Sequence, residues 1–421
     1  MSGRSESGGV TQETRSSVAG EGSIQGTFSS VAGEGASQGT PSPLAGEGWG
    51  GGAGTQATDG GGARAQAPAP DRSPNPEAKA VQPVPGPTPR RPPLPTAQAE
   101  KEFPGAPQPA ERPRILVLKL GAFGNVVLSL AAFAAIRRHH PDAEITLLTT
   151  APYAAWMADS PWFDRVLLDD RPSWWDLFGI LRLRRTLTEG GYQRVYDLQT
   201  SGRSSRYYRL FPRAARPEWS GIAPGCSHPD RDPERDCIHD IDRQFGQLRQ
   251  AGISEIPPAD LSWSHGDIAR FGLPSRIALL VPGSSPHRPQ KRWPAERYRA
   301  LALALAARGL TPVVLGAAGE AELAAVICRD TPARGLAGQT GFGDLAELGR
   351  AAELAVGNDT GPMHLLAAAG CPCLVLFSSD SDPARCAPRG RWVRTLQRPS
   401  LAELSLPEVL DALPVHAGAP A

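Results

Sequence analysis

The sequence predicts an α/β protein in which two doubly wound domains follow a disordered N-terminal tail. Three observations lead to this fold class. From Arg114 onward, short apolar runs alternate with segments whose apolar residues recur at helical spacing, a pattern typical of parallel sheets covered by helices. Several of these runs end in glycine-bearing turns. Residues 1–112 show neither pattern and are rich in Gly, Pro, Ser, Ala and Gln.

The tail has the composition of a chain that cannot form a core. It contains SSVAGEGSIQGTF, then SSVAGEGASQGTP and the shortened SPLAGEG, and a proline-rich linker follows. A stacked-repeat fold needs an apolar face in each unit, which one Val or Leu per repeat cannot supply. Residues 1–112 are therefore predicted to be disordered. They could be a tether or docking segment, but an appendage without function, or a misplaced translation start, is the favoured interpretation.

Composition argues against several functional classes. The chain carries 44 Lys and Arg against 43 Asp and Glu, a formal net charge of +1, which does not favour non-specific nucleic-acid binding. The sequence shows neither a secretory signal nor an apolar run of about 18 residues, so no membrane-spanning segment is predicted.

The six cysteines lack the spacing of a disulfide framework, which suits a reducing cytoplasm. Two C-x-H pairs, Cys226–His228 and Cys237–His239, offer four soft ligands. Structural zinc sites usually separate paired ligands by about two to four residues, so free thiols in a loop are favoured and no metal site is predicted.

The first domain is predicted to span residues 113–262. Its strands and helices are expected to alternate, in the order RILVLKL, VVLSLAAFAAIRRHH, EITLLT, APYAAWMA, RVLLDD, WWDLFGILRLRRTLTEG and RVYDLQ. A loop rich in Pro, Arg and Asp is expected over about 212–236, and a helix in IHDIDRQFGQLRQAGI follows it.

The second domain is predicted to span residues 276–396 and repeats this alternation. The expected elements are RIALLVPGSS, PAERYRALALALAARG, TPVVLGAAG, EAELAAVICRD, FGDLAELGRAA, LAVGND, GPMHLLAAAG and PCLVLF. Residues 397–421 are expected to hold a last helix, SLPEVLDALP, which crosses back onto the first domain, and a short tail. Ligands of such sheets bind beyond the carboxyl ends of the strands, which here meet at a cleft between the domains.

Two turns of the second domain have the residues of a diphosphate site. In VPGSSPHRPQKRWP, small residues follow a strand, so that backbone N–H groups can approach an anion, and Lys291 adds a mobile positive charge. In VGNDTGPMHLLAAAG, Pro362 fits the first turn of a helix, and the free N–H groups of residues 360, 361 and 363 are expected to face the ligand.

A third glycine turn, VVLGAAGEAE, brings Glu320 to a strand end, where its carboxylate could accept hydrogen bonds from ribose hydroxyls. Taken singly, Asp359 or Thr360 could be a helix cap and Lys291 a solvated surface residue. Three such turns at successive strand ends of one sheet favour a nucleotide site.

These motifs resemble glycosyltransferase family 9, the ADP-heptose lipopolysaccharide heptosyltransferases. GSS…KRWP, GAAGE, LAGQTGFGDLAEL and GNDTGPMHLLAAAG occur in the order that the family has, and ILVLKLGAFGNVVLSLAAFAAIRRHHP is similar to its N-terminal motif. The resemblance covers about residues 113–396, and NDTGPMH is its most specific part. It implies a GT-B fold, in which two Rossmann-like domains face each other with the nucleotide donor in the C-terminal one and the acceptor in the N-terminal one.

The resemblance also implies roles for individual residues. The donor diphosphate would be held by Ser284, Ser285 and Lys291, with Thr360, Gly361 and His364 at the phosphate-facing helix start, Asp359 near the sugar and Glu320 at the ribose. The implied reaction is inverting transfer of a heptose from ADP-heptose to a lipid A–Kdo or lipopolysaccharide core acceptor. The implied location is the cytoplasm, at the inner face of the inner membrane. The arrangement requires no cofactor, and assistance by Mg²⁺ stays open.

The chain departs from the family at Asn125, where an Asp that is the proposed base usually stands. An amide cannot accept the proton of the acceptor hydroxyl, although it can orient the acceptor. Asp197 at a strand end is an alternative base or a turn-capping residue, and His139, His140 and His239 are further candidates. A slow enzyme, and a homologue that only binds nucleotide sugar, also stay open.

Two clusters are candidates for acceptor binding. His239 and Arg243 share one face of a predicted helix with Asp242, an arrangement suited to a sugar acid, although an ordinary solvated face is the alternative. Arg203 and the other arginines of GRSSRYYR could contact acceptor phosphates or anionic lipid headgroups, with a cationic helix end as the alternative.

Overall fold

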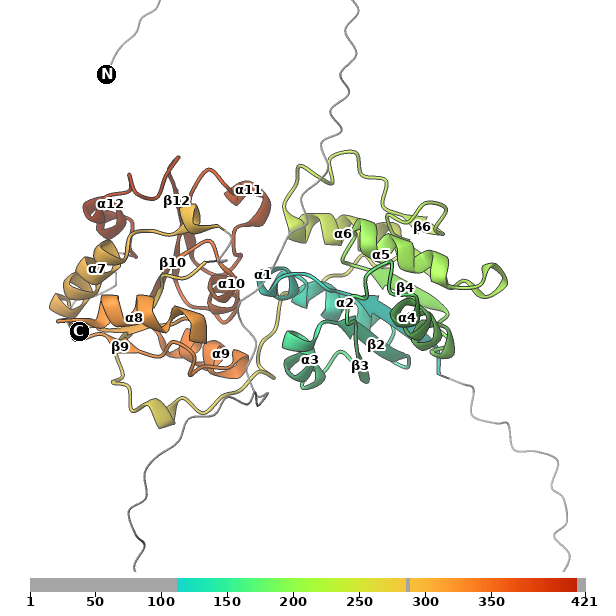
Figure 1. The fold of residues 1–421 in the computed structure, drawn as a ribbon, viewed down its shortest axis with the longest axis horizontal. Helices are drawn as coiled ribbons and strands as arrows, with labels where there is room; N and C mark the ends of the chain where they lie inside the picture. Colours follow the sequence, from blue (N-terminus) through green and yellow to red (C-terminus); the bar gives the residue numbers. More distant parts are fainter. Residues whose placement is uncertain (1–111, 285–287, 415–421) are drawn as a thin grey trace, which may run out of the picture. The chain divides into compact units, whose positions relative to one another are not determined.

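Two six-stranded parallel sheets, each accompanied by helices, make up the part of the chain that a computed structural model describes, residues 112–284 and 288–414 (Figure 1). The predicted disordered tail lies almost wholly outside these residues. We refer to the part up to Ile253, which contains the first sheet, as the N-terminal half, and to the part from Ile277, which contains the second, as the C-terminal half.

The first sheet has the strand order β3-β2-β1-β4-β5-β6. Its strands are β1 (Arg114–Leu118), β2 (Glu144–Thr149), β3 (Arg165–Leu168), β4 (Arg194–Asp197), β5 (Glu218–Gly221) and β6 (His228–Pro229). Central β1 is a continuous apolar run because both of its faces are covered. Leu118 pairs in register with Asp197, which places Lys119 and Asp197 at the same carboxyl edge of the sheet.

The helices of the N-terminal half are α1 (Phe123–Val127), α2 (Leu130–His139), α3 (Ala151–Ala158), α4 (Leu177–Glu189), α5 (Gly202–Tyr207) and α6 (Asp240–Gln250), with 3-10 turns η1 (Tyr208–Leu210) and η2 (Arg213–Ala215). The prediction of one helix from Val126 to His140 was wrong. Helix α1 begins within the glycine turn, and the chain breaks near Ser129, whose hydroxyl donates to the carbonyl of Asn125 (2.8 Å).

The expected loop over 212–236 was also wrong, because it contains β5 and β6. Trp219 is fully buried in β5 and anchors this part of the sheet. The sequence pattern does not mark this strand because it is short, follows Pro217 and ends at Gly221, and both of these residues are typical of turns.

The second sheet has the strand order β12-β11-β10-β7-β8-β9. Its strands are β7 (Ile277–Val281), β8 (Thr311–Val314), β9 (Arg334–Gly335), β10 (Leu354–Asn358), β11 (Cys373–Phe377) and β12 (Val393–Gln397). The helices are α7 (Ala295–Ala307), α8 (Ala321–Cys328), α9 (Phe342–Ala351), α10 (Gly361–Ala368), α11 (Pro383–Cys386) and α12 (Leu406–Asp411). Short 3-10 turns are η3 (Ala269–Phe271), η4 (Pro289–Lys291) and η5 (Ala318–Glu320).

The last helix does not cross back onto the first half, as the sequence led us to expect. Helix α12 packs against α7, and Val409 is buried in the core of the C-terminal half. Glu408 pairs with Arg398 just after β12, and the carbonyl of Leu404 accepts a hydrogen bond from Trp293 Nε1 (2.8 Å). These contacts hold α12 on its own sheet.

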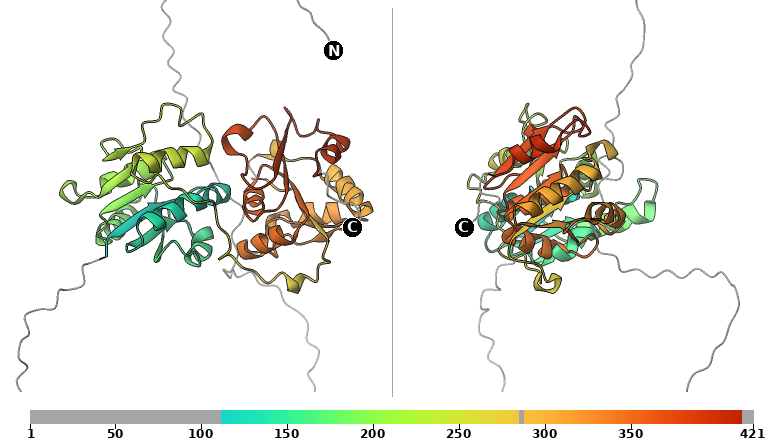
Figure 2. Two further views of the ribbon diagram at one scale, coloured as in Figure 1. Left: turned by 180° about the vertical axis from the view of Figure 1, so that it is seen from behind. Right: turned by 90° about the vertical axis from the view of Figure 1, so that its left-hand side faces the viewer.

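The two halves meet where α1 packs against α10, as Figures 1 and 2 show. The rings of Phe123 in α1 and Phe342 in α9 stack with centroids 4.4 Å apart. A Cβ atom on Gly361 would lie 2.8 Å from the ring of Phe123, so the first residue of α10 has to be glycine for this approach. The starts of two helices, each following a strand end, are thereby brought together.

In the part of the chain that the structure describes, no helix is both long and apolar enough to traverse a bilayer. All six cysteines of the chain are free thiols, and Cys237 is exposed.

Candidate active site

The turn after β7 supplies one wall of the candidate donor site. Ser284 is buried, and Arg292 braces it by donating from Nε to the hydroxyl (3.1 Å) and from Nη2 to the carbonyl (3.1 Å). Ser285, which the sequence assigns to the same diphosphate site, lies outside the described residues. Arg292 was not singled out from the sequence, because its role is visible only once the turn has closed.

The side chain of Asn358 fixes the position of this turn. Asn358 is fully buried at the end of β10, and its Oδ1 accepts from the backbone N–H of Trp293 (3.1 Å) and from the hydroxyl of Tyr298 (3.0 Å). Its Nδ2 donates to the carbonyl of Pro282 (2.6 Å). One buried amide therefore ties β10, the β7 turn and the start of α7 together, and a polar residue at the end of an apolar strand is the sequence signal for it.

Lys291 and Asp359 form the central charged pair of the site. The Nζ of Lys291 lies 2.6 Å from Oδ2 of Asp359, and the hydroxyl of Ser381 donates to the same oxygen (2.6 Å). The side chains of Lys291 and Asp359 are 11% and 9% exposed. Water screens such a pair weakly, so the lysine is held in one place next to the start of α10. The sequence predicted both residues in the site but neither their pairing nor the participation of Ser381.

The start of α10 comes directly after Asp359 in the chain. Thr360 precedes the helix with an extended backbone, and in the described part of the chain its side chain makes no capping hydrogen bond. The prediction that the N–H of residue 363 is free was wrong, because Met363 N donates to the carbonyl of Thr360 (3.1 Å) in a tight first turn. Residues Thr360 and Gly361 remain as the candidates for anion contact.

Glu320 reaches from the β8 turn toward the β7 turn. Its Oε2 accepts from Ala317 N (2.8 Å), and a Cβ atom on Gly283 would lie 1.9 Å from its Oε1. Burial raises the pKa of Glu320, while the N–H of Ala317 and the charge of Arg292 act in the opposite direction. The carboxylate thus borders the donor site from the side of β8.

His364 lies on α10 where the two halves meet. A Cβ atom on Gly124 would lie 2.8 Å from its Cδ2. The imidazole is 6% exposed, and burial lowers its pKa to about 4, with the opposing charge of Asp359 as the next cause. Its Nδ1 is buried and has no hydrogen-bond partner in the described part of the chain. His364 is therefore neutral at neutral pH.

Asn125 directly follows Gly124 in α1. It lies inside α1 rather than in an open turn, and its side chain is half-buried. Its amide Nδ2 and the Oε1 of Gln199 both border Gly121, where a Cβ atom would lie 3.2 Å from each. Gln199 Oε1 accepts from Leu120 N (2.9 Å), so β1 and β4 are joined directly below Asn125.

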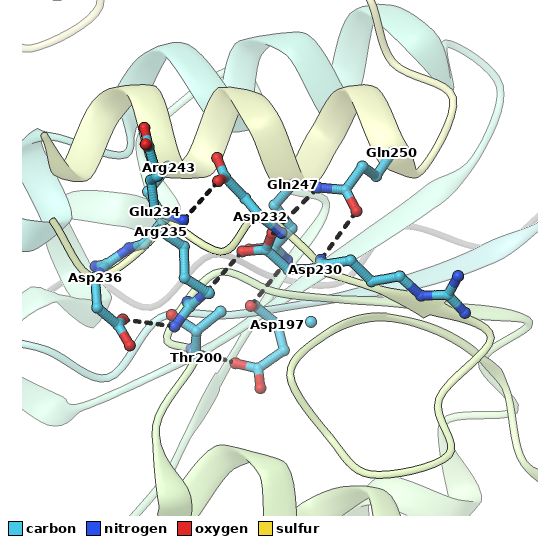
Figure 3. Close-up of polar contacts among 12 residues, drawn as sticks. Asp197, Thr200, Asp230, Asp232, Glu234, Arg235, Asp236, Arg243, Gln247 and Gln250 are labelled. Atoms are coloured by element: carbon cyan, nitrogen blue, oxygen red, sulfur yellow. Dashed lines mark hydrogen bonds and ion pairs between the residues drawn. The ribbon is translucent and has the colours of Figure 1, made fainter. Parts of the chain in front are cut away.

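Asp197 is buried at the end of β4 and has the contacts of a turn-capping residue. Its Oδ1 accepts from the N–H groups of Gln199 (3.1 Å) and Thr200 (3.0 Å), and Gln247 of α6 donates to its carbonyl (3.0 Å; Figure 3). Burial raises the pKa of Asp197 to about 6 against these donors. Because its exposure is 0%, the carboxylate does not reach an acceptor hydroxyl in this structure.

Lys119, which the sequence reasoning missed, lies beside Asp197. Its Nζ donates to the carbonyl of Leu198 (3.0 Å), and burial lowers its pKa to about 8, partly opposed by the charges of Asp240 and Asp197. A lysine that directly extends an apolar central strand was the available signal, since such a residue ends at the carboxyl edge of the sheet.

The helix face proposed for His239, Asp242 and Arg243 is not formed as predicted. His239 is the N-cap of α6: its Nδ1 accepts from Ile241 N (3.1 Å), and its Nε2 donates to the carbonyl of Ala387 in the C-terminal half (2.9 Å). Asp242 forms a two-point ion pair with Arg389, and Arg243 pairs with Asp240 (2.6 Å). His239 and Asp242 thus join the two halves, Arg243 pairs within α6, and the three side chains do not present one open face.

The remaining candidates lie elsewhere. Helix α2 runs from the carboxyl edge of the sheet to the amino edge, where His139 and His140 lie, and His140 contacts the hydroxyl of Tyr196 (2.8 Å). Because the candidate site lies at the opposite, carboxyl edge of the sheet, these two histidines are excluded as catalytic bases. Arg203 donates to the carbonyl of Pro172 (3.1 Å) and lies over the ring of Trp174. Over residues 112–284 and 288–414, no three His, Cys, Asp or Glu side chains are grouped to hold a metal ion.

Three comparisons agree with this arrangement. The family model of glycosyltransferase family 9 (heptosyltransferase) matches residues 239–405. The chain is 25% identical over 299 residues to the lipopolysaccharide core heptosyltransferase OpsX of Haemophilus influenzae, covering 66% of this chain and 82% of that protein.

Solved structures resemble it in fold. The glycosyl transferase family 9 structure from Veillonella parvula matches with a TM-score of 0.61 and 21% identity, over 71% of this chain and 95% of that one. The ADP-heptose lps heptosyltransferase II of E. coli matches with a TM-score of 0.58 and 21% identity, over 71% and 96%. The two parallel sheets, each with its strand-end turns, thus form a GT-B fold. With the motif-bearing turns assembled at one junction, the chain is similar to the heptosyltransferases of glycosyltransferase family 9, whose family model matches its residues 239–405.

Proposed function

We propose that the protein transfers a heptose, with inversion, from ADP-heptose to a lipopolysaccharide core acceptor. The observation that carries the proposal is the Lys291 ammonium, held by Asp359 next to the start of α10. A diphosphate leaving group placed there would receive both a lysine charge and helix N–H groups. The relatives suggest the chemistry, because one is a lipopolysaccharide core heptosyltransferase and another an ADP-heptose lps heptosyltransferase.

On the donor side, Ser284, Thr360 and Gly361 contact the diphosphate together with Lys291, and Glu320 contacts the ribose. An ammonium has three donor hydrogens, so Lys291 can bind a phosphate oxygen while it keeps its bond to Asp359. The positive charge is therefore oriented before the donor arrives, and negative charge that develops on the leaving ADP is stabilised without rearrangement. We place the nucleotide-binding domain at 276–396 and the acceptor domain at 113–262.

On the acceptor side, Asn125 orients the attacking hydroxyl from the first turns of α1. Its amide cannot accept the proton, and Asp197 is buried. Orientation of the two substrates and stabilisation of the leaving group then account for the rate enhancement. The proton of the acceptor hydroxyl is released to solvent. Arg203, His239 and Arg243 are the candidate acceptor contacts of the N-terminal half, and His239 also holds the start of α6 against Ala387. No cofactor takes part, and stimulation by Mg²⁺ with loss on chelation would support the alternative. The reaction belongs to the cytoplasmic face of the inner membrane.

The test is release of ADP from ADP-heptose by the purified chain in the presence of deacylated lipid A–Kdo or longer core acceptors. Calorimetric titration with ADP measures donor binding separately. Acceptor-dependent ADP release, and heptosylated product by mass spectrometry, is the expected result.

Asn125 favours one alternative, a homologue that binds nucleotide sugar but transfers it poorly or not at all. Tight ADP binding without ADP release for any core acceptor would establish this alternative and end the proposal of transfer.

A further inference from the structure

The exposed apolar side chains of the molecule are concentrated at one place. Five of the six large apolar residues that are exposed in the described part of the chain lie between positions 168 and 181. They are Leu168 (51% exposed), Trp175 (91%), Leu177 (69%), Phe178 (87%) and Leu181 (57%). We call these five residues the apolar tip. Single exposed apolar residues are ordinary, but a contiguous group marks an interaction surface.

The tip is presented by an ordered helix start. Asp176 caps α4 by accepting from Gly179 N (2.8 Å), which fixes where the helix begins. Gly179, Leu183 and Leu187 form the inward face of α4 and are buried. The side chains of Leu177, Phe178 and Leu181 consequently point away from the protein, although α4 already has a core face of its own. The exposed apolar side chains therefore lie on a second face of α4, which the folded core does not need.

Arginines surround the tip. Arg182, Arg184 and Arg185 occupy the next turns of α4, and residues 202–216, from α5 to just after η2, hold five arginines and no acidic residue. In the described ranges, no ion-pair partner is found for Arg184, Arg206, Arg209 or Arg213. Arg182 and Arg185 pair with exposed carboxylates, and such pairs are weak.

Trp174 joins the two charged segments to the tip. The guanidinium of Arg203 lies 5.5 Å and that of Arg206 5.1 Å from the centre of its ring. Helix α4 also contacts η1. Trp174 and the contact of α4 with η1 thus bring the arginines of residues 202–216 next to the segment that carries the apolar tip.

We propose that this surface docks on an anionic lipid bilayer, with the apolar tip at the boundary between headgroups and acyl chains and the arginines at the headgroup phosphates. Trp, Phe and Leu beside arginine are the composition of such interfacial elements. A second copy of the chain is the other possible occupant. In a two-fold dimer through this surface, residues 202–216 would approach their own copy and bring like charges together, which disfavours it.

The surface lies at the reaction edge of the sheet. Helix α4 starts after β3, at the carboxyl edge, and a guanidinium nitrogen of Arg171 donates to the carbonyl of Leu120, which directly precedes the glycine turn of α1. A protein docked through the tip would therefore present its acceptor side toward the bilayer. This inference extends the proposed function but does not depend on it, because lipid binding is measured without substrates.

The test is flotation of the full chain with vesicles of phosphatidylcholine alone and of phosphatidylcholine with phosphatidylglycerol. The tip variant is Trp175→Ser with Phe178→Ser. The matched control is Leu303→Ser, since Leu303 on α7 is also exposed (45%) but lies in the C-terminal half, outside residues 168–216. A charge variant is Arg206→Gln with Arg209→Gln.

We expect the unaltered chain to bind anionic vesicles about tenfold more tightly than neutral ones, with binding that weakens as salt rises. The tip and charge variants should each lose about tenfold, and Leu303→Ser should not change. ADP release with a soluble deacylated acceptor and the melting temperature should be unaltered in the tip variant, which separates this test from that of the transfer reaction. Equal vesicle binding by the tip variant and the unaltered chain would overturn the proposal. So would a dimer that dissociates in the tip variant while neither protein binds vesicles.

Discussion

Gly124 of α1 and His364 of α10 touch across the junction of the two halves with no room for a methyl group between them. The Cβ atom of an alanine at 124 would lie 2.8 Å from the imidazole carbon and 3.0 Å from its Nε2. The residue that follows Gly124 is the one expected to meet the acceptor, and His364 follows the proposed diphosphate contacts. This contact therefore sets how closely acceptor and donor can approach.

Gly124→Ala is expected to push α1 and α10 apart. The cost of overpacking is about 1–3 kcal/mol in unfolding free energy, and ADP release should fall about tenfold or more because the substrates no longer meet at bonding distance. Chemical denaturation and initial rates measure the two effects. Gly202→Ala is the matched control, because a Cβ atom there meets nothing within 4 Å, and it should leave both quantities unchanged. Equal rates for the two variants would show that the Gly124–His364 contact does not position substrate.

Lys291→Ala is expected to weaken ADP binding about 10- to 100-fold. The diphosphate loses a charge-assisted hydrogen bond, and Asp359 is left nearly buried with only the Ser381 hydroxyl as partner. Calorimetric titration with ADP gives the dissociation constant. Ser381→Ala, which removes a hydroxyl and leaves the ion pair, should change it less than about threefold. A Lys291→Ala variant that binds ADP as tightly as the unaltered chain would remove Lys291 from the donor site.

Asn125→Asp is expected to increase the rate of transfer by about 10²-fold. A carboxylate at this half-buried position supplies a general base that the described residues do not otherwise place at the start of α1. The gain should appear as pH rises through the pKa of the new carboxyl group and should be absent well below it. Asn125→Ser, which offers no comparable base, is the control. A rate that does not change in Asn125→Asp would mean that the base lies elsewhere.

Asp197→Asn is expected to flatten the acid side of the stability profile. Since the pKa of Asp197 is about 6 in the folded state and near 3.8 when unfolded, the folded state binds more protons between these values. Stability from this group is full below pH 4 and is lost as pH rises through 6, by up to about 3 kcal/mol. Urea denaturation from pH 4 to 7 should show this loss in the unaltered chain and not in Asp197→Asn. Parallel profiles for the two proteins would contradict the raised pKa.

Local pattern was sufficient to predict the fold class and the central strands. The apolar runs of β1, β7, β10 and β11 are buried on both sides and are bounded by turn residues, so their period and length identify them. The edge strands β6 and β9 have two residues each and carry no such signal. The break between α1 and α2 depends on one hydroxyl–carbonyl bond at Ser129, which competes with the helix and which hydrophobic spacing does not report.

The donor turns could be predicted because small residues, a lysine and a helix start are local features. The pairing of Lys291 with Asp359, 68 positions away, and the contact of Gly124 with His364 arise only from the packing of elements that are distant in sequence. For His239, by contrast, the sequence held a local signal that the prediction did not use. Asp240 and Asp242 stand in the first turn of α6, and acids there mark a helix that begins at Asp240, so its role as N-cap was available from the sequence.

The bonds of α6 to the segment after α11 have a consequence for turnover. His239 bonds to Ala387, and Asp242 pairs with Arg389. The same helix carries Gln247, whose amide donates hydrogen bonds at the ends of β4 and β5. A rotation of one half against the other would break these bonds before it moved the strand ends. The Asp242–Arg389 pair is nearly half exposed on both sides, so dissolved ions weaken it. In the proposed reaction, higher ionic strength should therefore speed the release of ADP and leave the rate of the transfer step unchanged.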